Sequence, residues 1–398
     1  MAPYESDDTV DAARDETPHA GRRKAARYAV PVAVVGVAAA TIGLVPALAA
    51  SGDPDLPRIT AQQLIDKIAK SDVQQLSGTV RISTDLGLPN LGGLENSLAS
   101  GAAKGSGDGS SADPQSKLTS LVSGTHTLRV AADGPERQKL SLLESGSEYS
   151  LIHNGKDEWG YDSKSNEVYH GTSADSGKDH GAEPPATPKD FADQALKSVD
   201  DTTSVTVDGT ERVAGRDAYK LLVKPRQSGT TVGAISIAVD AKTGMPLKFT
   251  LTPKSGGAAV LDAGFTQVSF ARPAASTFEF TAPKGAKVTE QKKDATARQE
   301  QRPGMGFAGD HGKGTVLGKG WTSVATFDTG AKGGLPTGSR GGDLGGFLGS
   351  LGDKVTGKFG KGTVFSTRLV NALVTDDGRV YVGAVTKDAL VKAADTGK

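Results

Sequence analysis

The sequence of 398 residues contains no cysteine, which excludes disulfide bonds, thiolate metal sites and lipid attachment to a cysteine. Aromatic residues make up only 5% of the chain. Its 46 basic and 46 acidic residues give a formal net charge of zero. Nothing in this composition therefore indicates a nucleic-acid partner or a strongly anionic partner. The chain does contain one long uncharged run, and that run decides how the rest is interpreted.

Residues 28–50 form the apolar run, and a basic cluster from Arg22 to Arg27 precedes it. At about 1.5 Å per helical residue, the run is long enough to cross the hydrocarbon core of a bilayer. Basic residues at one end hold that end in the cytoplasm. We therefore expect residues 1–27 to be a disordered cytoplasmic tail, and the chain after Ala50 to lie outside the cell membrane.

Two interpretations of the run stay open. Ala47-Leu48-Ala49 is a small-x-small site, which favours a signal peptide cleaved after Ala49 or Ala50. The length of the run and the long acidic leader before it favour a retained single-pass transmembrane helix. Arg22-Arg23 lacks the apolar residues that follow a twin-arginine pair, so we interpret it as an ordinary basic flank.

Residues 59–290 are expected to form one large domain. Thr60 and Gln63 make a capping-box pattern at the start of a helix. Short segments with alternating apolar and polar residues then follow one another, separated by turn signals such as Asn154-Gly155. A second helix is expected over residues 189–199. The pattern predicts an α+β fold, with an open, strongly curved antiparallel β-sheet or half-barrel and covering helices.

Several stretches interrupt this pattern. Residues 85–124 contain leucines among glycines and a Gly/Ser-rich middle that predicts a flexible loop. Residues 86–98 and 344–355 share a Leu-Gly composition, which fits either irregular core or a mobile apolar lid. Residues 291–313 are interpreted as a linker. Residues 314–398 predict a small C-terminal α+β module.

Three motifs in the second half of the large domain are more specific. They are V-x-G-R-x-A-Y-x-L from Val213 to Leu221, A-V-D-x-x-T-G-x-P-L-K from Ala238 to Lys248, and F-E-F-x-x-P-x-G-A-x-V from Phe278 to Val288. With the preceding export segment, capped helix and strands, residues 59–290 resemble the LolA-type lipoprotein carriers, in the version found as envelope proteins of Gram-positive bacteria. They are also similar to the periplasmic sigma-factor regulators of the RseB/MucB type.

This resemblance implies a half-open β-barrel with helices over its concave face and an apolar cavity that takes up acyl chains. An acyl chain needs only apolar area, worth about 25 cal/mol per Å² buried. Core packing is the alternative role for every candidate, because most apolar positions that alternate along strands form a core. The candidate cavity residues are the apolar members of the alternating strands: Val80, Ile82, Leu128, Val130, Leu140, Leu142, Tyr149, Leu151, Trp159, Tyr161, Tyr219, Leu221, Ile235, Ile237, Phe249 and Leu251, with Val268 and Phe270 beside them.

The chain departs from a simple carrier in three ways. The insertion at residues 85–124 is long, a retained anchor would tether the domain, and simple carriers lack a module after residue 303. The motifs place turns and strand edges rather than catalytic atoms. They therefore support a fold more directly than they support an activity.

No enzyme signature stands out. The 6 histidines show no metal-ligand spacing, no G-x-S-x-G elbow occurs, and Gly312-Lys-Gly lacks the context of a P-loop. We expect no catalytic residues, no metal and no cofactor, and we interpret residues 240–248 as a hairpin corner.

Three functional hypotheses follow. The first is an extracytoplasmic, membrane-associated protein that binds lipid or the acyl part of lipoproteins. The second is an RseB/MucB-like regulator that senses envelope lipid and acts through a protein partner. The third is a structural envelope module without a ligand. Co-purified lipid separates the first two hypotheses from the third, and a captured partner separates the second from the first.

Overall fold

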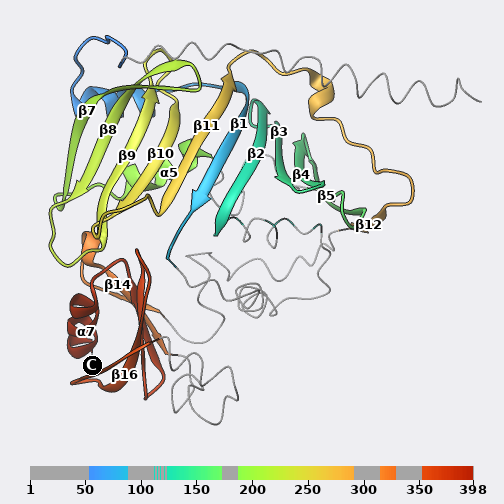
Figure 1. The fold of residues 1–398 in the computed structure, drawn as a ribbon. Coiled ribbons are helices and arrows are strands. Elements are labelled where there is room, and N and C mark those ends of the chain that lie inside the picture. The colour runs from blue at the N-terminus through green and yellow to red at the C-terminus, as the bar shows by residue number, and fades with distance from the viewer. Residues whose placement is uncertain are drawn as a thin grey trace, which may run out of the picture. The chain divides into compact units, whose positions relative to one another are not determined.

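The alternating segments fold into one large sheet (Figure 1). The computed structural model describes residues 53–87, 123–172, 187–290, 314–328 and 352–397, with the single residues 112, 114, 117 and 121. The strands of the large sheet are β1 (Gln75–Thr84), β2 (Gly124–Asp133), β3 (Arg137–Glu144), β4 (Ser147–Asn154), β5 (Asp157–Asp162), β6 (Glu167–Thr172), β7 (Thr203–Val213), β8 (Arg216–Pro225), β9 (Val232–Asp240), β10 (Pro246–Pro253), β11 (Leu261–Ser269) and β12 (Lys287–Glu290).

The order of these strands is β12-β6-β5-β4-β3-β2-β1-β11-β10-β9-β8-β7. The sheet is open, because its two edge strands, β12 and β7, do not pair with each other. The predicted α+β fold with an open sheet is confirmed. The strongly curved half-barrel is a finer prediction, and this open, uncurled sheet does not establish it.

The end of the large domain departs from the predicted antiparallel sheet. After β11 the chain forms a short 3-10 helix, η2 (Ala275–Thr277), and continues as irregular structure. It then forms β12, which pairs with β6 in parallel, so the sheet is not wholly antiparallel. The physical reason is the path of the chain: it leaves β11 in the middle of the sheet and returns to the far edge, on β6.

The two predicted helices, α2 (Ala61–Ala69) and α5 (Pro188–Lys197), are confirmed. The Thr60 side chain accepts a hydrogen bond from the backbone N–H of Gln63, and the Gln63 side chain accepts one from Thr60, as the capping box predicted. A second capping box, between Thr187 and Asp190, starts α5. Each helix is short and turns a narrow apolar stripe toward the sheet.

The C-terminal residues form a second, six-stranded sheet, in the order β13-β14-β18-β17-β16-β15. Residues 53–398 are one compact unit, so the boundary of a separate module stays a prediction. Helix α7 (Lys387–Thr396) contributes Leu390 and Ala394 to the core of this part, and Thr386 caps its N-terminus. The elements are β13 (Thr315–Leu317), η3 (Gly320–Thr322), β14 (Val324–Asp328), β15 (Asp353–Gly357), β16 (Gly360–Ser366), β17 (Asn371–Thr375), β18 (Arg379–Gly383) and α7 (Lys387–Thr396).

The sequence pattern did not predict the β15–β16 hairpin. Buried side chains at Phe359 and Val364 hold the hairpin in the core of the second sheet. Glycine at four positions between residues 352 and 362 conceals the alternation that a strand normally shows. Most of residues 86–98 and 344–355 lie outside the described residues.

Candidate functional site

One face of the large sheet is an apolar layer, which we call the inner face and define by Val80, Leu128, Leu142 and Tyr149. These four residues stand opposite one another in register on β1, β2, β3 and β4. All four are buried. Because side chains in a strand alternate between faces, their neighbours Thr79, Arg129, Ser141 and Ser150 define the opposite, outer face.

The inner face continues across the other half of the sheet, where two helices cover it. Leu64 and Ile68 of α2 and Ala192 of α5 pack in one core cluster with side chains of β8, β9 and β10. The candidates in this cluster are Tyr219, Leu221, Ile235, Ile237 and Phe249, with Leu251 half-buried beside them. Helix and sheet therefore meet in the arrangement that the resemblance implies.

Most candidate residues are closed core in this structure. Val80, Ile82, Leu128, Val130, Leu142 and Tyr149 are buried in one cluster, and Leu140, Leu151, Val268 and Phe270 pack against it. In this structure these positions therefore pack as core, which is the alternative role given for every candidate. A ligand on this face would have to separate the sheet from what covers it.

Part of the long insertion covers the inner face beside β4 and β5. The Tyr149 hydroxyl donates a hydrogen bond to the backbone oxygen of Ala112, at 3.1 Å. Leu121 is buried in the same core cluster as Leu142. Lys117 Nζ lies 2.8 Å from Asp162 Oδ2. We call Ala112, Lys117 and Leu121 the cover.

The Lys117–Asp162 ion pair fastens the cover to the sheet. Asp162 is 4% exposed. Burial opposes its ionisation, but hydrogen bonds from Lys117 and from the backbone N–H of Lys164 outweigh burial and hold the pKa of this carboxyl below its ordinary 3.8. The charged carboxylate therefore depends on Lys117, and separation of the cover would leave a buried charge without its partner.

Trp159 and Tyr161 do not share the inner face with the other candidates. They pair with His170 and Val168 of β6, on the outer face. The inner-face positions of β5 are instead Gly160 and Asp162. Alternation places Trp159 and Tyr161 on a common face, but it does not say which face that is.

On the outer face, Trp159 belongs to an aromatic cluster that holds the end of the domain. The Trp159 ring stacks on His170 at 3.8 Å between centroids and also contacts Phe280. His170 Nδ1 lies 2.8 Å from Glu290 Oε2, and His170 Nε2 lies 3.1 Å from Asp157 Oδ1. His170 therefore links β6 to Asp157 on β5 and to Glu290 on β12.

We expect His170→Phe to release β12 from β6 while stacking on Trp159 is kept. The phenyl ring replaces the imidazole but offers no partner to Asp157 or Glu290. Amide hydrogen exchange at residues 287–290 should become faster, while exchange in β3 and β4 stays unchanged. Lys287→Gln is the matched control on β12, because it removes only an exposed ion pair with Glu167. Equal exchange in both variants would contradict the assigned role of His170.

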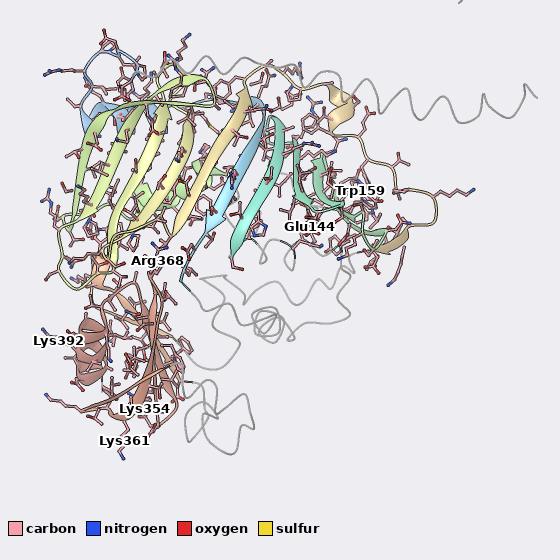
Figure 2. The ribbon with its side chains drawn as sticks, in the orientation of Figure 1. Glu144, Trp159, Lys354, Lys361, Arg368 and Lys392 are labelled. Carbon is pink, nitrogen blue, oxygen red and sulfur yellow. The ribbon has the colours of Figure 1, made fainter. Side chains whose placement is uncertain are left out.

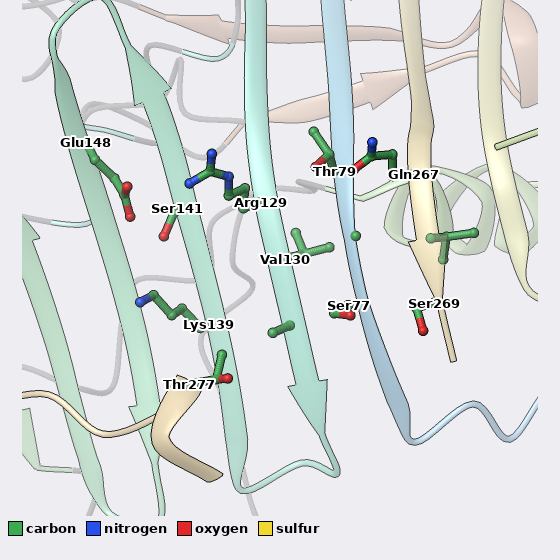
Figure 3. Close-up of a pocket in the computed structure, with 13 residues that line it drawn as sticks. Ser77, Thr79, Arg129, Val130, Lys139, Ser141, Glu148, Gln267, Ser269 and Thr277 are labelled. Carbon is green, nitrogen blue, oxygen red and sulfur yellow. The ribbon is translucent and has the colours of Figure 1, made fainter. Parts of the chain in front are cut away.

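A polar groove of about 470 Å³ lies on the outer face (Figure 3). Sequence reasoning missed it because only the apolar members of each strand were considered. The signal was present in the polar members of the same strands. The residues that line it are Ser77, Gly78, Thr79, Arg129, Val130, Ala131, Lys139, Ser141, Glu148, Gln267, Val268, Ser269 and Thr277.

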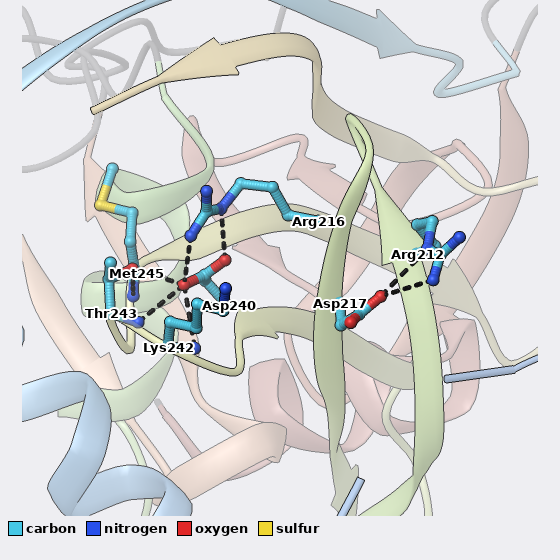
Figure 4. A network of polar contacts seen from close by, with 7 residues as sticks. All are labelled: Arg212, Arg216, Asp217, Asp240, Lys242, Thr243 and Met245. Atoms are coloured by element: carbon cyan, nitrogen blue, oxygen red, sulfur yellow. Dashed lines mark hydrogen bonds and ion pairs between the residues drawn. The ribbon is translucent and has the colours of Figure 1, made fainter. Parts of the chain in front are cut away.

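The predicted hairpin corner at residues 240–248 is confirmed (Figure 4). The Asp240 carboxylate accepts hydrogen bonds from the backbone N–H groups of Lys242 and Thr243 and from the Thr243 hydroxyl. Arg216 Nη2 donates to Asp240 Oδ1 at 3.1 Å. Arg216 and Asp240 come from two of the three motifs, so this ion pair joins those two motifs in space.

Several contacts join residues of the second sheet to the first sheet. Thr230, in the turn after β8, forms a β-bridge with Val385. Arg368, in the turn after β16, donates from Nη1 to the Asp85 carboxylate at 2.6 Å, and its backbone N–H donates to Leu86 (Figure 2). Asp85 lies where the insertion leaves β1, so the contact joins the second sheet to the start of the insertion.

Two further results concern metal sites and membrane-spanning helices in the described residues. Within them, no three His, Cys, Asp or Glu side chains are placed to hold a metal ion. No helix in the described part of the chain is long and apolar enough to span a membrane. The apolar run at residues 28–50 lies outside that part.

No family model and no curated protein matches the chain. Among solved structures, it is similar to the MucA/MucB complex of Pseudomonas aeruginosa, with 17% identity, 84% of this chain and 96% of that chain covered, and a TM-score of 0.38. A LolA superfamily protein from Nitrosomonas europaea has 11% identity over 56% of this chain and 99% of its own, with a TM-score of 0.21. An uncharacterized conserved protein from Thermus thermophilus has 14% identity over 58% and 99%, with a TM-score of 0.31. At these scores the likenesses carry no functional argument.

Proposed function

We propose that this protein is an extracytoplasmic, membrane-associated binding protein of LolA-like fold, and that it holds lipid or the acyl part of lipoproteins against the inner face. One observation carries the proposal: a continuous apolar face is covered by separate short pieces. These pieces are α2, α5 and the cover.

The energetics suit such a ligand. Moving a short helix exposes far less apolar area than separating two sheets would, and an acyl chain can cover the exposed area again. Each buried methylene group contributes about 0.8 kcal/mol. Binding therefore requires no polar side chains on the inner face. It requires only that the cover and the sheet can separate.

Native mass spectrometry of the purified protein tests whether lipid is bound. A fatty acid with a photoreactive diazirine on its tail then maps the site without destabilising substitutions. We expect labelling of inner-face residues such as Leu142 and not of its neighbour Leu143, which points to the outer face. Absence of co-purified lipid, together with labelling spread equally over both faces, would refute the proposal.

A regulatory role is the second candidate function, and the Arg368 contact is the observation that favours it. A ligand that displaces the insertion would disturb Asp85 and so reach the second sheet. A partner protein bound to residues 314–398 would then respond to lipid. Arg368→Ala is expected to abolish the effect of lipid on partner capture while lipid binding itself persists. An undiminished effect of lipid on capture would exclude this route.

The proposed location gives a separate expectation. The basic flank from Arg22 to Arg27 should keep residues 1–27 inside the cell and place residues 51–398 outside. Protease added to intact protoplasts should degrade the large domain and spare an epitope tag at the N-terminus. A protected large domain would refute export.

A further inference from the structure

Three cations form a diagonal line on the outer face: Arg81 on β1, Arg129 on β2 and Lys139 on β3. Arg129 stands opposite Thr79 and Ser141. Arg81 and Lys139 are each two residues along their strands from those positions. Such diagonal neighbours on one face of a sheet are about 7–8 Å apart. We call these three residues the basic diagonal.

Within the part of the chain that the structure describes, none of the three forms an ion pair, although other cations on this face do. Lys220 Nζ lies 3.2 Å from Asp208 Oδ2, and Lys248 Nζ lies 3.2 Å from Asp262 Oδ2. Like charges on neighbouring strands of one sheet face repel each other. The basic diagonal therefore keeps a local excess of positive charge that an anion would relieve.

The groove beside these cations offers hydroxyl groups and no aromatic ring. Ser77, Thr79, Ser141 and Ser269 contribute short hydroxyl side chains, and Gln267 contributes an amide. Figure 3 shows this floor on both sides of β2, with Arg129 and Lys139 extending toward the side where Ser141 and Glu148 lie. Glu148, the acidic member of the lining, accepts a hydrogen bond from Ser150. The lining suits an anion with neighbouring hydroxyl groups, and it offers no ring for stacking a nucleobase.

We propose that this groove binds a polyol phosphate: a phosphate group held by Arg129 and Lys139, with the hydroxyl groups of the polyol on the serine and threonine floor. Charge-assisted hydrogen bonds from Arg and Lys to phosphate are among the stronger polar contacts. The phosphate can belong to a lipid headgroup or to a soluble molecule. The groove lies on the opposite face from the proposed acyl site, so either site can fail without the other.

The test uses the full chain, purified in neutral detergent, with inositol hexakisphosphate as the soluble probe and calorimetry as the readout. Arg129→Gln combined with Lys139→Gln should weaken binding about tenfold or more. Lys220→Gln combined with Lys248→Gln is the matched control. It removes the same charge from the same face but takes cations that already have partners, and it should change affinity less than about twofold. Circular dichroism verifies that both double variants are folded.

A second arm distinguishes the sources of the phosphate. Bilayer nanodiscs of phosphatidylcholine, with and without phosphatidylinositol, are offered to the same three proteins. The site is supported if either probe binds the wild type and the control variant but not the Arg129/Lys139 variant. The probe that binds then shows whether the phosphate belongs to a lipid headgroup or to a soluble molecule. Lack of binding to both probes overturns the proposal. Equal weakening in both double variants also overturns it, because net charge alone would then account for binding.

Discussion

Asp240→Asn is expected to lower the free energy of unfolding by about 2–4 kcal/mol, because Arg216 then loses its charged partner at a buried position. The Asp240 side chain is 1% exposed, and its carboxylate accepts bonds from both Arg216 and the turn. The hairpin that closes β9 and β10 should loosen first. Urea unfolding followed by circular dichroism measures the change.

Asp217→Asn is the matched control, since Asp217 pairs with Arg212 where both side chains are exposed (Figure 4). It should cost less than about 1 kcal/mol. Equal effects of the two substitutions would show that the corner contributes no special stability.

The same site predicts a pH dependence. Burial opposes ionisation of Asp240, but hydrogen bonds from Arg216 and Thr243 hold its pKa below the ordinary 3.8. A carboxyl with a lowered folded-state pKa contributes stability above its unfolded pKa and loses it as the pH falls through the folded value. The difference in stability between wild type and Asp240→Asn should therefore be largest near neutral pH and shrink below about pH 3.8. A difference independent of pH would contradict this assignment.

Local signals predicted local structure well. The capping box at Thr60 and Gln63 depends only on residues three apart, and it forms as expected. The cap at Thr386 is likewise local, since its side chain accepts from the backbone N–H of Ala389. Alternation also predicted most of the inner face, because a one-residue slip would expose Leu128 and Leu142 to solvent.

Features set by distant segments were not predictable in this way. Trp159 and Tyr161 alternate like their neighbours, but the chain beyond β11 covers them on the outer face with Phe280. The parallel pairing of β12 depends on the same returning segment. No residue near Lys287 signals that its partner strand begins 120 positions earlier, at Glu167.

The two faces of one sheet thus carry different chemistry. Apolar side chains on the inner face pack under the cover, whereas Arg129 and Lys139 share a groove on the outer face with hydroxyl side chains. A two-residue period in the sequence encodes both sets at once. The apolar half of the pattern predicts the inner face, and the polar half of the same strands lines the groove on the outer face.

Fixing the cover to the sheet is expected to abolish uptake of fatty acid. The native chain has no cysteine, so Lys117→Cys with Asp162→Cys creates a unique pair of thiols where the ion pair stood. A short bismaleimide can join them, and mass spectrometry verifies the link. If the ligand enters by separating Lys117 from Asp162, the joined protein should fail to bind a fluorescent fatty acid.

The unlinked double variant makes this experiment decisive. It lacks both the buried carboxylate of Asp162 and the ammonium group that holds it, so the cover should separate more readily than in the wild type. We therefore expect uptake faster than wild type before linking and none after it. The same variant with each thiol blocked singly controls for the added bulk. Undiminished uptake by the linked protein would show that Ala112, Lys117 and Leu121 are permanent core rather than a separable cover.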